Sequence, residues 1–408
     1  MGKNKEKIQR KTIDTLGVML FLIMLGLLVW GLIMIASSSA YTSVIREDRP
    51  MYSYIRKQAL AEMMGLVLVA IIMTPWGGFV ISLFRRSFPR WVLLILAVAS
   101  VFLLLFIGNA EGGATRWFTI PHTSINVQPA EIVKASLILV LAGEISSYTG
   151  LNRLWAGYAV LFGLAAALAA IVYEISDNLS SAMIIAGIGF VMLFVSTKDI
   201  KLHFGMVIAG LIIASLFVQH MRKLPPSAEY DFRTQRVLAW LHPENYMDGT
   251  GYQTMQALYA IGSGGVLGKG IGQGIQKLGK VPEVHNDMIF SVVCEETGLL
   301  GAAGLIVLFG AMVLCIGMIA LKTHDIYKKL VVSGVMAHIA IQVMLNIMVV
   351  TAITPNTGVG LPFISYGGSA VLVLMAEVGI VMRISWENAC TIVEFKDRKA
   401  KKSETDRT

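Results

Sequence analysis

Long apolar runs recur along this chain and constrain its fold more than any other feature. Of its 408 residues, 55% are hydrophobic and only 15% are charged, whereas about a quarter of the residues in soluble domains are charged. Each run is about 18 to 25 residues long, the length at which a helix crosses the hydrocarbon core of a membrane. The runs are continuous rather than alternating, which indicates helices and not barrel strands. We therefore expect an all-α fold, a polytopic membrane helix bundle.

The apolar runs predict about ten transmembrane helices. They lie near residues 16–36, 58–75, 90–108, 129–147, 154–173, 179–197, 203–219, 299–321, 330–353 and 367–385. An even number of spans places both termini on the same side of the membrane. The largest polar segment, residues 220–298, then forms a loop between spans seven and eight.

The basic residues indicate the orientation. Most Lys and Arg lie at the two termini and in three loops, residues 85–90, 198–201 and 322–329. The positive-inside rule makes these parts cytoplasmic, although the opposite loop at 40–57 has four basic residues of its own. We expect a cytoplasmic tail at 1–14, a membrane domain at 15–385 that includes the extracellular loop 220–298, and a basic cytoplasmic tail at 386–408.

The net charge of +8 does not predict nucleic-acid binding, because the basic residues are spread over short loops and termini. The three cysteines, Cys294, Cys315 and Cys390, lie in or beside apolar runs. Their spacing indicates neither a metal site nor a disulfide framework.

The most polar cluster lies where the eighth span begins. His285, Asp287, Glu295 and Glu296 fall within about three helical turns. Carboxylates at the mouth of a membrane span are costly and usually functional. Helix capping by Asn286 or Asp287 is the alternative, but it explains one acid and not the whole cluster. We therefore favour a functional site here.

Other charged residues are candidates for a binding or catalytic site, and a purely structural role is the alternative. Arg116 beside Trp117 either anchors a helix end or holds a phosphate, whose geometry a guanidinium matches. Glu131 and Lys134 share a helix face, are expected to pair, and should face a polar cavity. Arg233 and Arg236 share one face of a short amphipathic helix over residues 227–240.

Several polar residues carry weaker signals. Asp177 or Asn178 is either the N-cap of the sixth span or a functional residue. His338 and Glu377 lie inside apolar runs, and their roles stay open. The glycines of residues 262–274 do not predict a nucleotide loop, because no strand precedes them and no Lys-Ser/Thr pair follows. They favour close backbone approach to a lipid head group or a neighbouring helix.

The loop before the last span, residues 354–369, has two prolines and four glycines around a Leu361-Pro-Phe-Ile core. Irregular backbone near a membrane must be buried in protein or line a cavity. We expect this loop, which includes Ser365, to fold back into the bundle.

Four motifs in order along the chain resemble the SEDS family (FtsW, RodA and SpoVE). They are Arg116-Trp117, Gln128-Pro-Ala-Glu131 with Lys134, Pro282-Glu-Val-His-Asn-Asp287, and Leu361-Pro-Phe-Ile-Ser-Tyr-Gly-Gly-Ser369. Two departures are Asn286, where the family often has Thr, and the Asp177-Asn-Leu-Ser-Ser181 start of the sixth span. The latter leaves the role of Asn178 in doubt. The Trp240-Leu-His-Pro and glycine motifs are more similar to the FtsW and SpoVE branch than to RodA.

The resemblance implies a peptidoglycan glycosyltransferase that polymerises lipid II on the outer face of the bacterial plasma membrane. It implies a class B penicillin-binding protein as partner, with other divisome or elongation membrane proteins. Asp287 matches the family's essential outer-loop aspartate, and Arg116, Glu131 and Lys134 match its other conserved charges.

We expect Asp287 to act as general base towards the acceptor hydroxyl. The expected substrate-binding residues are Arg116, Glu131, Lys134, Arg233, Arg236, His285 and Ser365. No metal ligand set is evident, although a divalent cation (Mg or Mn) could assist. A lipid II flippase or transporter, a non-enzymatic scaffold and a RodA-like elongation polymerase are the alternatives.

Overall fold

The structure is a computed structural model. It describes residues 14–46, 50–111, 114–119, 126–147, 155–197, 200–225, 230–246, 249, 251–278, 281–282 and 284–405. The predicted N-terminal tail therefore lies outside the described residues except for Asp14. Residues 112–113 and 120–125 of the second outer loop also lie outside them.

The ten predicted spans correspond to ten helices or helix pairs. They are α2 (Thr15–Tyr41), α3 (Ser53–Met73) with α4 (Pro75–Phe84), α5 (Ser87–Ile107), α6 (Pro129–Ser147), α7 (Trp155–Ser176), α8 (Leu179–Ser196), α9 (Ile200–Met221), α12 (Ile289–Lys322), α13 (Ile326–Val350) and α14 (Gly368–Thr405). Within the described residues, eight of these helices are long and apolar enough to cross a membrane, and the bent pair α3–α4 would add a ninth. The remaining helix, α6, is less apolar because it carries Glu131, Lys134 and Glu144. The polytopic all-α bundle is confirmed.

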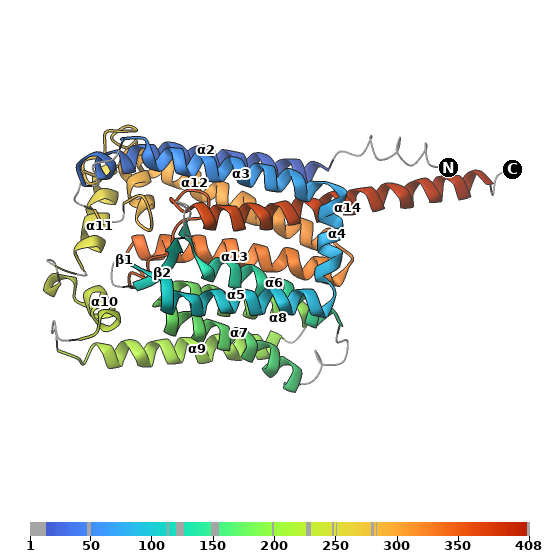
Figure 1. Cartoon of the computed structure of the whole chain (residues 1–408), viewed down its shortest axis with the longest axis horizontal. Coiled ribbons are helices and arrows are strands. Elements are labelled where there is room, and N and C mark those ends of the chain that lie inside the picture. The colour runs from blue at the N-terminus through green and yellow to red at the C-terminus, as the bar shows by residue number, and fades with distance from the viewer. Residues whose placement is uncertain are drawn as a thin grey trace.

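Burial differs sharply between the helices. α13 lies in the middle of the bundle, packed against α6, α8 and α12, whereas α9 runs along one edge (Figure 1). Two thirds of the apolar window of α13 (67%) is buried, against 6% for α9. Side chains of α9 such as Phe204, Leu211 and Ile213 are exposed. A patch of this kind suits a lipid environment rather than water.

A sharp break separates α3 from α4. Thr74 is extended and Pro75 opens α4, because the residue before a proline is pushed away from the helical region. The two helices are bent by 82°. A Cβ at Gly77 would overlap with the carbonyl of Ile72, so glycine permits the close turn. α4 consequently lies across one end of the bundle (Figure 1).

The opposite end of the bundle carries the long loop and a small antiparallel sheet. The sheet has the order β1 (Asn109–Glu111), β2 (Ala114–Thr119) and β3 (Asn126–Val127), an addition that the all-α prediction did not include. Short helices follow in the long loop: α10 (Phe232–Leu241), the 3-10 turn η3 (Pro243–Asn245) and α11 (Tyr252–Gly264). A π-helical turn, η1 (Thr42–Arg46), ends α2.

The loop between α13 and α14 folds back into the bundle as expected. Leu361, Phe363 and Ile364 are buried. Gly31 of α2 lies so close to the carbonyl of Phe363 that a Cβ would overlap with it. After this loop, α14 continues without a break past residue 385 to Thr405, so the domain boundary at 385 stays a prediction.

Candidate functional site

Asp287 is a buried carboxylate at the start of α12, with 8% of the residue exposed. Helix capping by Asn286 or Asp287, the alternative to a functional site, is not what the structure shows, because α12 begins after Met288 and no side chain caps it. Instead, Gln253 of α11 donates a hydrogen bond from Nε2 to Asp287 Oδ1 at 3.2 Å. Asn356 in turn donates to Gln253 Oε1 at 2.8 Å. Two segments, α11 and the loop after α13, therefore help to orient this carboxylate.

The backbone on either side of Asp287 is held by the loop after α13 and by α13 itself. Ser365 Oγ donates to the carbonyl of Asn286 at 2.7 Å and accepts the Leu361 amide at 2.6 Å. Asn346 Nδ2 of α13 donates to the Asp287 carbonyl at 2.8 Å. The hydroxyl of Ser365 is thus engaged with backbone, so its predicted contact with substrate stays a prediction.

His285 lies in an aromatic setting beside Asp287. Its ring centroid is 4.5 Å from that of Tyr54 and 5.9 Å from that of Tyr366. The Tyr366 amide donates to the His285 carbonyl at 2.9 Å. These contacts fix the direction in which the chain enters the Asp287 turn.

Arg116 and Arg236 supply positive charge to the same region. Arg116 of β2 is buried, and its guanidinium lies 3.4 Å from the carbonyls of Gly358 and Asp177. A Cβ at Gly358 would overlap with this guanidinium, which explains the glycine. Burial, and then the charge of Arg116, lowers the pKa of Arg236 to about 10, while Asp287 and Asp177 oppose the change. Arg236, Arg116 and Asp287 therefore interact electrostatically.

Arg233, which shares a helix face with Arg236, is bonded to Asp177 and stacked on Tyr173. Its Nε donates to Asp177 Oδ1 at 2.8 Å, and its guanidinium carbon lies 4.2 Å from the Tyr173 ring centroid. The hydrogen bond with Asp177 raises the pKa of Arg233. The structure thus separates two arginines that the sequence treated alike.

A second polar cluster lies within the bundle. Lys134 Nζ contacts Glu131 Oε1 at 2.7 Å, which confirms the expected pairing, and Gln342 Oε1 at 3.2 Å. His338 Nδ1 lies 2.8 Å from Glu377 Oε2, and His338 Nε2 lies 3.0 Å from Gln342 Oε1. All five residues are buried. His338 and Glu377, whose roles the sequence left open, therefore belong with the Glu131–Lys134 pair.

Comparisons with known proteins agree with this architecture. A family model named for FtsW, RodA and SpoVE, and described as cell cycle protein, matches residues 18–389. The chain belongs to this family. The resemblance drawn from its motifs is thereby confirmed.

Relatives within the family cover nearly the whole chain. A probable peptidoglycan glycosyltransferase FtsW of Geobacter metallireducens is 31% identical over 93% of this chain and 97% of its own length. Stage V sporulation protein E of Bacillus subtilis is 32% identical over 90% and 96%. These identities do not separate the division branch from the sporulation branch.

Solved structures share the fold. One, described as structural coordination of polymerization and crosslinking by a peptidoglycan synthase complex, matches with a TM-score of 0.69 and 25% identity over 90% of this chain and 97% of that one. Thermus thermophilus RodA matches with a TM-score of 0.57 and 22% identity over 90% and 95%. The second likeness supports the fold alone.

In this member of the family, polar side chains of α13 join the two clusters. His338, Gln342 and Asn346 recur at every fourth residue and so share one helix face. Gln342 Nε2 donates to the Gly360 carbonyl at 3.1 Å, and Asn346 Nδ2 donates to that of Val359 at 2.7 Å. The fourth-residue spacing was visible in the sequence, but the partners were not.

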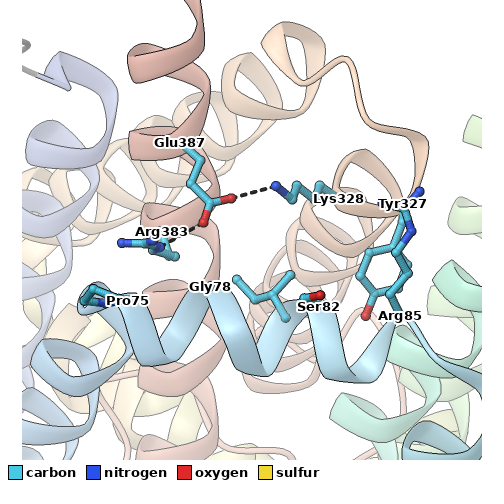
Figure 2. A pocket seen from close by; sticks show the side chains of 9 residues that line it. Pro75, Gly78, Ser82, Arg85, Tyr327, Lys328, Arg383 and Glu387 are labelled. Atoms are coloured by element: carbon cyan, nitrogen blue, oxygen red, sulfur yellow. Dashed lines mark hydrogen bonds and ion pairs between the residues drawn. The ribbon is translucent and has the colours of Figure 1, made fainter. Parts of the chain in front are cut away.

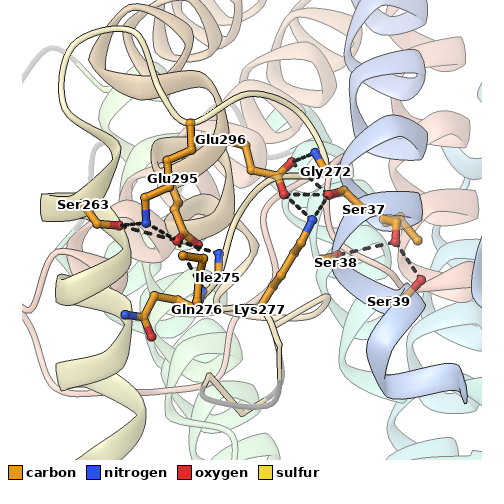
Figure 3. Close-up of polar contacts among 12 residues, drawn as sticks. Ser37, Ser38, Ser39, Ser263, Gly272, Ile275, Gln276, Lys277, Glu295 and Glu296 are labelled. Atoms are coloured by element: carbon orange, nitrogen blue, oxygen red, sulfur yellow. Dashed lines mark hydrogen bonds and ion pairs between the residues drawn. The ribbon is translucent and has the colours of Figure 1, made fainter. Parts of the chain in front are cut away.

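Glu295 and Glu296 do not join the Asp287 site, which corrects the expected four-residue cluster. Glu295 accepts hydrogen bonds from Lys269 Nζ and the Ile275 amide, at 2.8 and 2.9 Å (Figure 3). Glu296 accepts from Lys277 Nζ at 2.6 Å and from Ser37 Oγ of α2 at 2.7 Å. The two carboxylates anchor the glycine-rich loop to α12 and α2.

The glycine-rich loop approaches α12 closely. Close approach to a neighbouring helix was one of the two expectations, beside approach to a lipid head group. Gly268 has a φ of +77°, and a Cβ there would overlap with the carbonyl of Glu296. Only glycine adopts this backbone so near a neighbour without strain. Over the described residues, no group of three or more His, Cys, Asp or Glu is placed to hold a metal ion.

Proposed function

We propose that this chain is a peptidoglycan glycosyltransferase that polymerises lipid II into glycan strands on the outer face of the bacterial plasma membrane. The observation that carries the proposal is the buried Asp287 carboxylate, oriented by Gln253 and coupled to Arg236 near Arg116. The FtsW and SpoVE relatives support it, as does the motif match. Cell division or sporulation is the process served, with RodA-like elongation as the alternative.

In the proposed reaction, Asp287 takes the proton of the acceptor sugar hydroxyl as its oxygen attacks the donor's anomeric carbon. The bond from that carbon to the lipid-linked pyrophosphate breaks, and the pyrophosphate leaves with the bonding electrons. A positioned base of this kind typically contributes about 10²- to 10⁴-fold in rate. Because pyrophosphate is a good leaving group, no second carboxylate is needed.

Positive charge near the departing pyrophosphate is the second requirement. Arg116 and Arg236 supply it in the proposal, because a guanidinium offers two donors to phosphate oxygens. Arg233 acts indirectly, through Asp177, whose carbonyl lies beside Arg116. Glu131, Lys134, His285 and Ser365 remain proposed substrate-binding or positioning residues. A divalent cation, Mg²⁺ or Mn²⁺, is the cofactor that this chemistry could use, and loss of activity on chelation would reveal it.

The proposed orientation places both termini in the cytoplasm and Asp287 outside. α2 begins and α14 leaves the bundle at the same end, where Asp14 Oδ1 lies 2.8 Å from Ser385 Oγ. That end carries Arg85, Arg86 and Lys328, in agreement with the positive-inside rule. The partner in the proposal is a class B penicillin-binding protein, by analogy with the peptidoglycan synthase complex that this chain resembles.

The test is polymerisation of lipid II by the purified chain with its class B partner. Wild type should yield glycan polymer on a gel, and Asp287→Asn should yield none while keeping the wild-type melting temperature. Glu244→Gln removes an exposed carboxylate of the same outer loop and should leave the rate unchanged. Polymer from Asp287→Asn at the wild-type rate would refute the assigned base.

A lipid II transporter is the second candidate, because the buried Glu131–Lys134–His338–Glu377 cluster is the kind of intramembrane charge that transport pathways use. This alternative predicts movement of labelled lipid II across vesicles by both wild type and Asp287→Asn. Polymer formation that depends on Asp287 decides against it as the main activity.

A further inference from the structure

A cavity of about 330 Å³ lies beside α4, at the end of the bundle opposite to Asp287 (Figure 2). Its volume falls within the roughly 300 to 1,000 Å³ that small-molecule sites occupy. α4, the start of α13 and the later part of α14 enclose it. None of the residues that line it takes part in the proposed polymerisation.

Basic side chains outnumber acidic ones around this cavity. Lys328 Nζ and Arg383 Nε both donate to the carboxylate of Glu387, at 2.6 and 3.0 Å. Arg85 pairs with Asp325 at 2.9 Å. Three cations thus share two carboxylates, which leaves one positive charge. Such a site favours a ligand with a single negative charge.

Tyr327 provides a second, independent observation. The residue is 1% exposed and lines the cavity, and Figure 2 shows its ring above α4 near Arg85. Among the residues that the structure describes, its hydroxyl has no hydrogen-bond partner. A buried hydroxyl without a partner is uncommon in native proteins. It points to a polar group that the protein does not supply itself.

The surroundings of α4 indicate where that group comes from. Trp76 is 71% exposed and Phe79 is 59% exposed, and neither is among the residues that line the cavity. Phe88, just beyond α4, is also exposed. A short helix that turns aromatic side chains outward at the end of a membrane bundle lies at the lipid interface. The cavity therefore lies at the level of lipid headgroups.

We propose that this cavity binds the headgroup of an anionic phospholipid from the leaflet at this end of the bundle. The single phosphodiester charge matches the one positive charge that Glu387 and Asp325 leave over among Arg85, Lys328 and Arg383. Arg85, half-exposed at the rim, donates to phosphate oxygens, and the buried Tyr327 hydroxyl donates to the same group. Basic pockets between helices on the cytoplasmic side are suited to such headgroups, and burial strengthens the bond from the Tyr327 hydroxyl.

The test uses the full-length chain in nanodiscs of phosphatidylcholine with increasing phosphatidylglycerol, followed by its melting temperature. Phosphatidylglycerol should raise the melting temperature of wild type in a saturable way. Tyr327→Phe keeps the ring and should melt like wild type in pure phosphatidylcholine, yet bind phosphatidylglycerol about fivefold more weakly. Arg85→Gln should weaken binding by about fivefold as well.

Arg86→Gln is the matched control. Arg86 adjoins Arg85, is exposed and does not line the cavity, so its loss should leave the lipid affinity unchanged. Equal weakening by Arg86→Gln would show diffuse attraction to the membrane surface and overturn the site. Unchanged affinity in Tyr327→Phe would also overturn it. Displacement of the lipid by millimolar inorganic phosphate would identify a soluble anion as the ligand instead.

Discussion

At the residue scale, an amide side chain helps to orient Asp287. Gln253 donates to its carboxylate, and Asn356 fixes Gln253. An amide partner holds the direction of the carboxylate without placing a full positive charge on the oxygen that receives the proton. The two guanidiniums, Arg116 and Arg236, interact with the leaving pyrophosphate in the proposed reaction.

Gln253→Leu should lower polymerisation by about tenfold with little change in substrate KM. The substitution removes one hydrogen bond to the base, and such bonds contribute about 0.5–1.5 kcal/mol. Rates from a lipid II polymerisation assay measure the effect. Gln219→Leu changes an amide on the exposed face of α9 and should keep the wild-type rate. A Gln253→Leu enzyme of full activity would remove this residue from the site.

Arg236 and Arg233 should differ when each is replaced by alanine. Loss of one donor to transition-state charge costs about 10²- to 10³-fold in kcat, which we expect for Arg236→Ala. Arg233 is 35% exposed in its pair with Asp177, and exposed pairs contribute about 0–1 kcal/mol, so Arg233→Ala should lose only a few-fold. Equal losses in the two variants would contradict the division of roles.

The pKa of Arg236 gives the same site a pH dependence. Its value of about 10 lies below the ordinary pKa of an arginine. The guanidinium therefore stays protonated at neutral pH and loses its charge as pH rises through about 10. The rate of wild type should fall over that upper range, whereas the Arg236→Ala rate should not show this fall. Melting temperatures at each pH separate the effect from unfolding.

At the element scale, α13 connects the buried cluster to the Asp287 turn. Asn346→Leu leaves the carbonyls of Asp287 and Val359 without their donor, and an unpaired buried group costs about 1–3 kcal/mol. We expect a lower melting temperature and a lower rate. Ser333→Ala on the same helix removes a bond only to the Lys329 carbonyl and should affect neither. An active, stable Asn346→Leu protein would show that the connection has no function.

The glycine-rich loop offers another comparison between two positions. Gly268→Ala forces a side chain into positive φ and into the carbonyl of Glu296, which should cost at least about 1–2 kcal/mol. Gly262→Ala meets nothing within 4 Å and should be neutral. Thermal unfolding and protease cleavage within the loop would measure both. Similar behaviour of the two variants would argue against the observed packing of the loop on α12.

At the scale of the whole molecule, the buried charges join α6, α13 and α14. Removing one partner of a buried ion pair costs about 3–5 kcal/mol, because the other charge is left uncompensated. Lys134→Met should therefore destabilise the protein more than the double variant Lys134→Met with Glu131→Gln. Melting temperatures of the two single variants and the double variant form the cycle. A double variant as unstable as the sum of the singles would show that the two charges do not interact.

The sequence by itself determined the class of fold and the positions of the spans. The length of an apolar run is a local property, and a run long enough to cross a membrane must form a helix there to satisfy its backbone hydrogen bonds. The folding of the 354–369 loop back into the bundle also followed from the local sequence, because irregular backbone near a membrane must be buried in protein or line a cavity.

Only the tertiary structure decided which charges act together. Glu295 and Glu296 neighbour Asp287 in sequence but bond to the glycine-rich loop and α2, whereas His338 and Glu377, 39 positions apart, meet inside the bundle. Arg233 and Arg236 share a helix face, yet the hydrogen bond with Asp177 raises the pKa of Arg233 whereas burial lowers the pKa of Arg236. The physical reason is that the energy of a buried charge depends on what surrounds it in space, and packing between distant helices sets those surroundings.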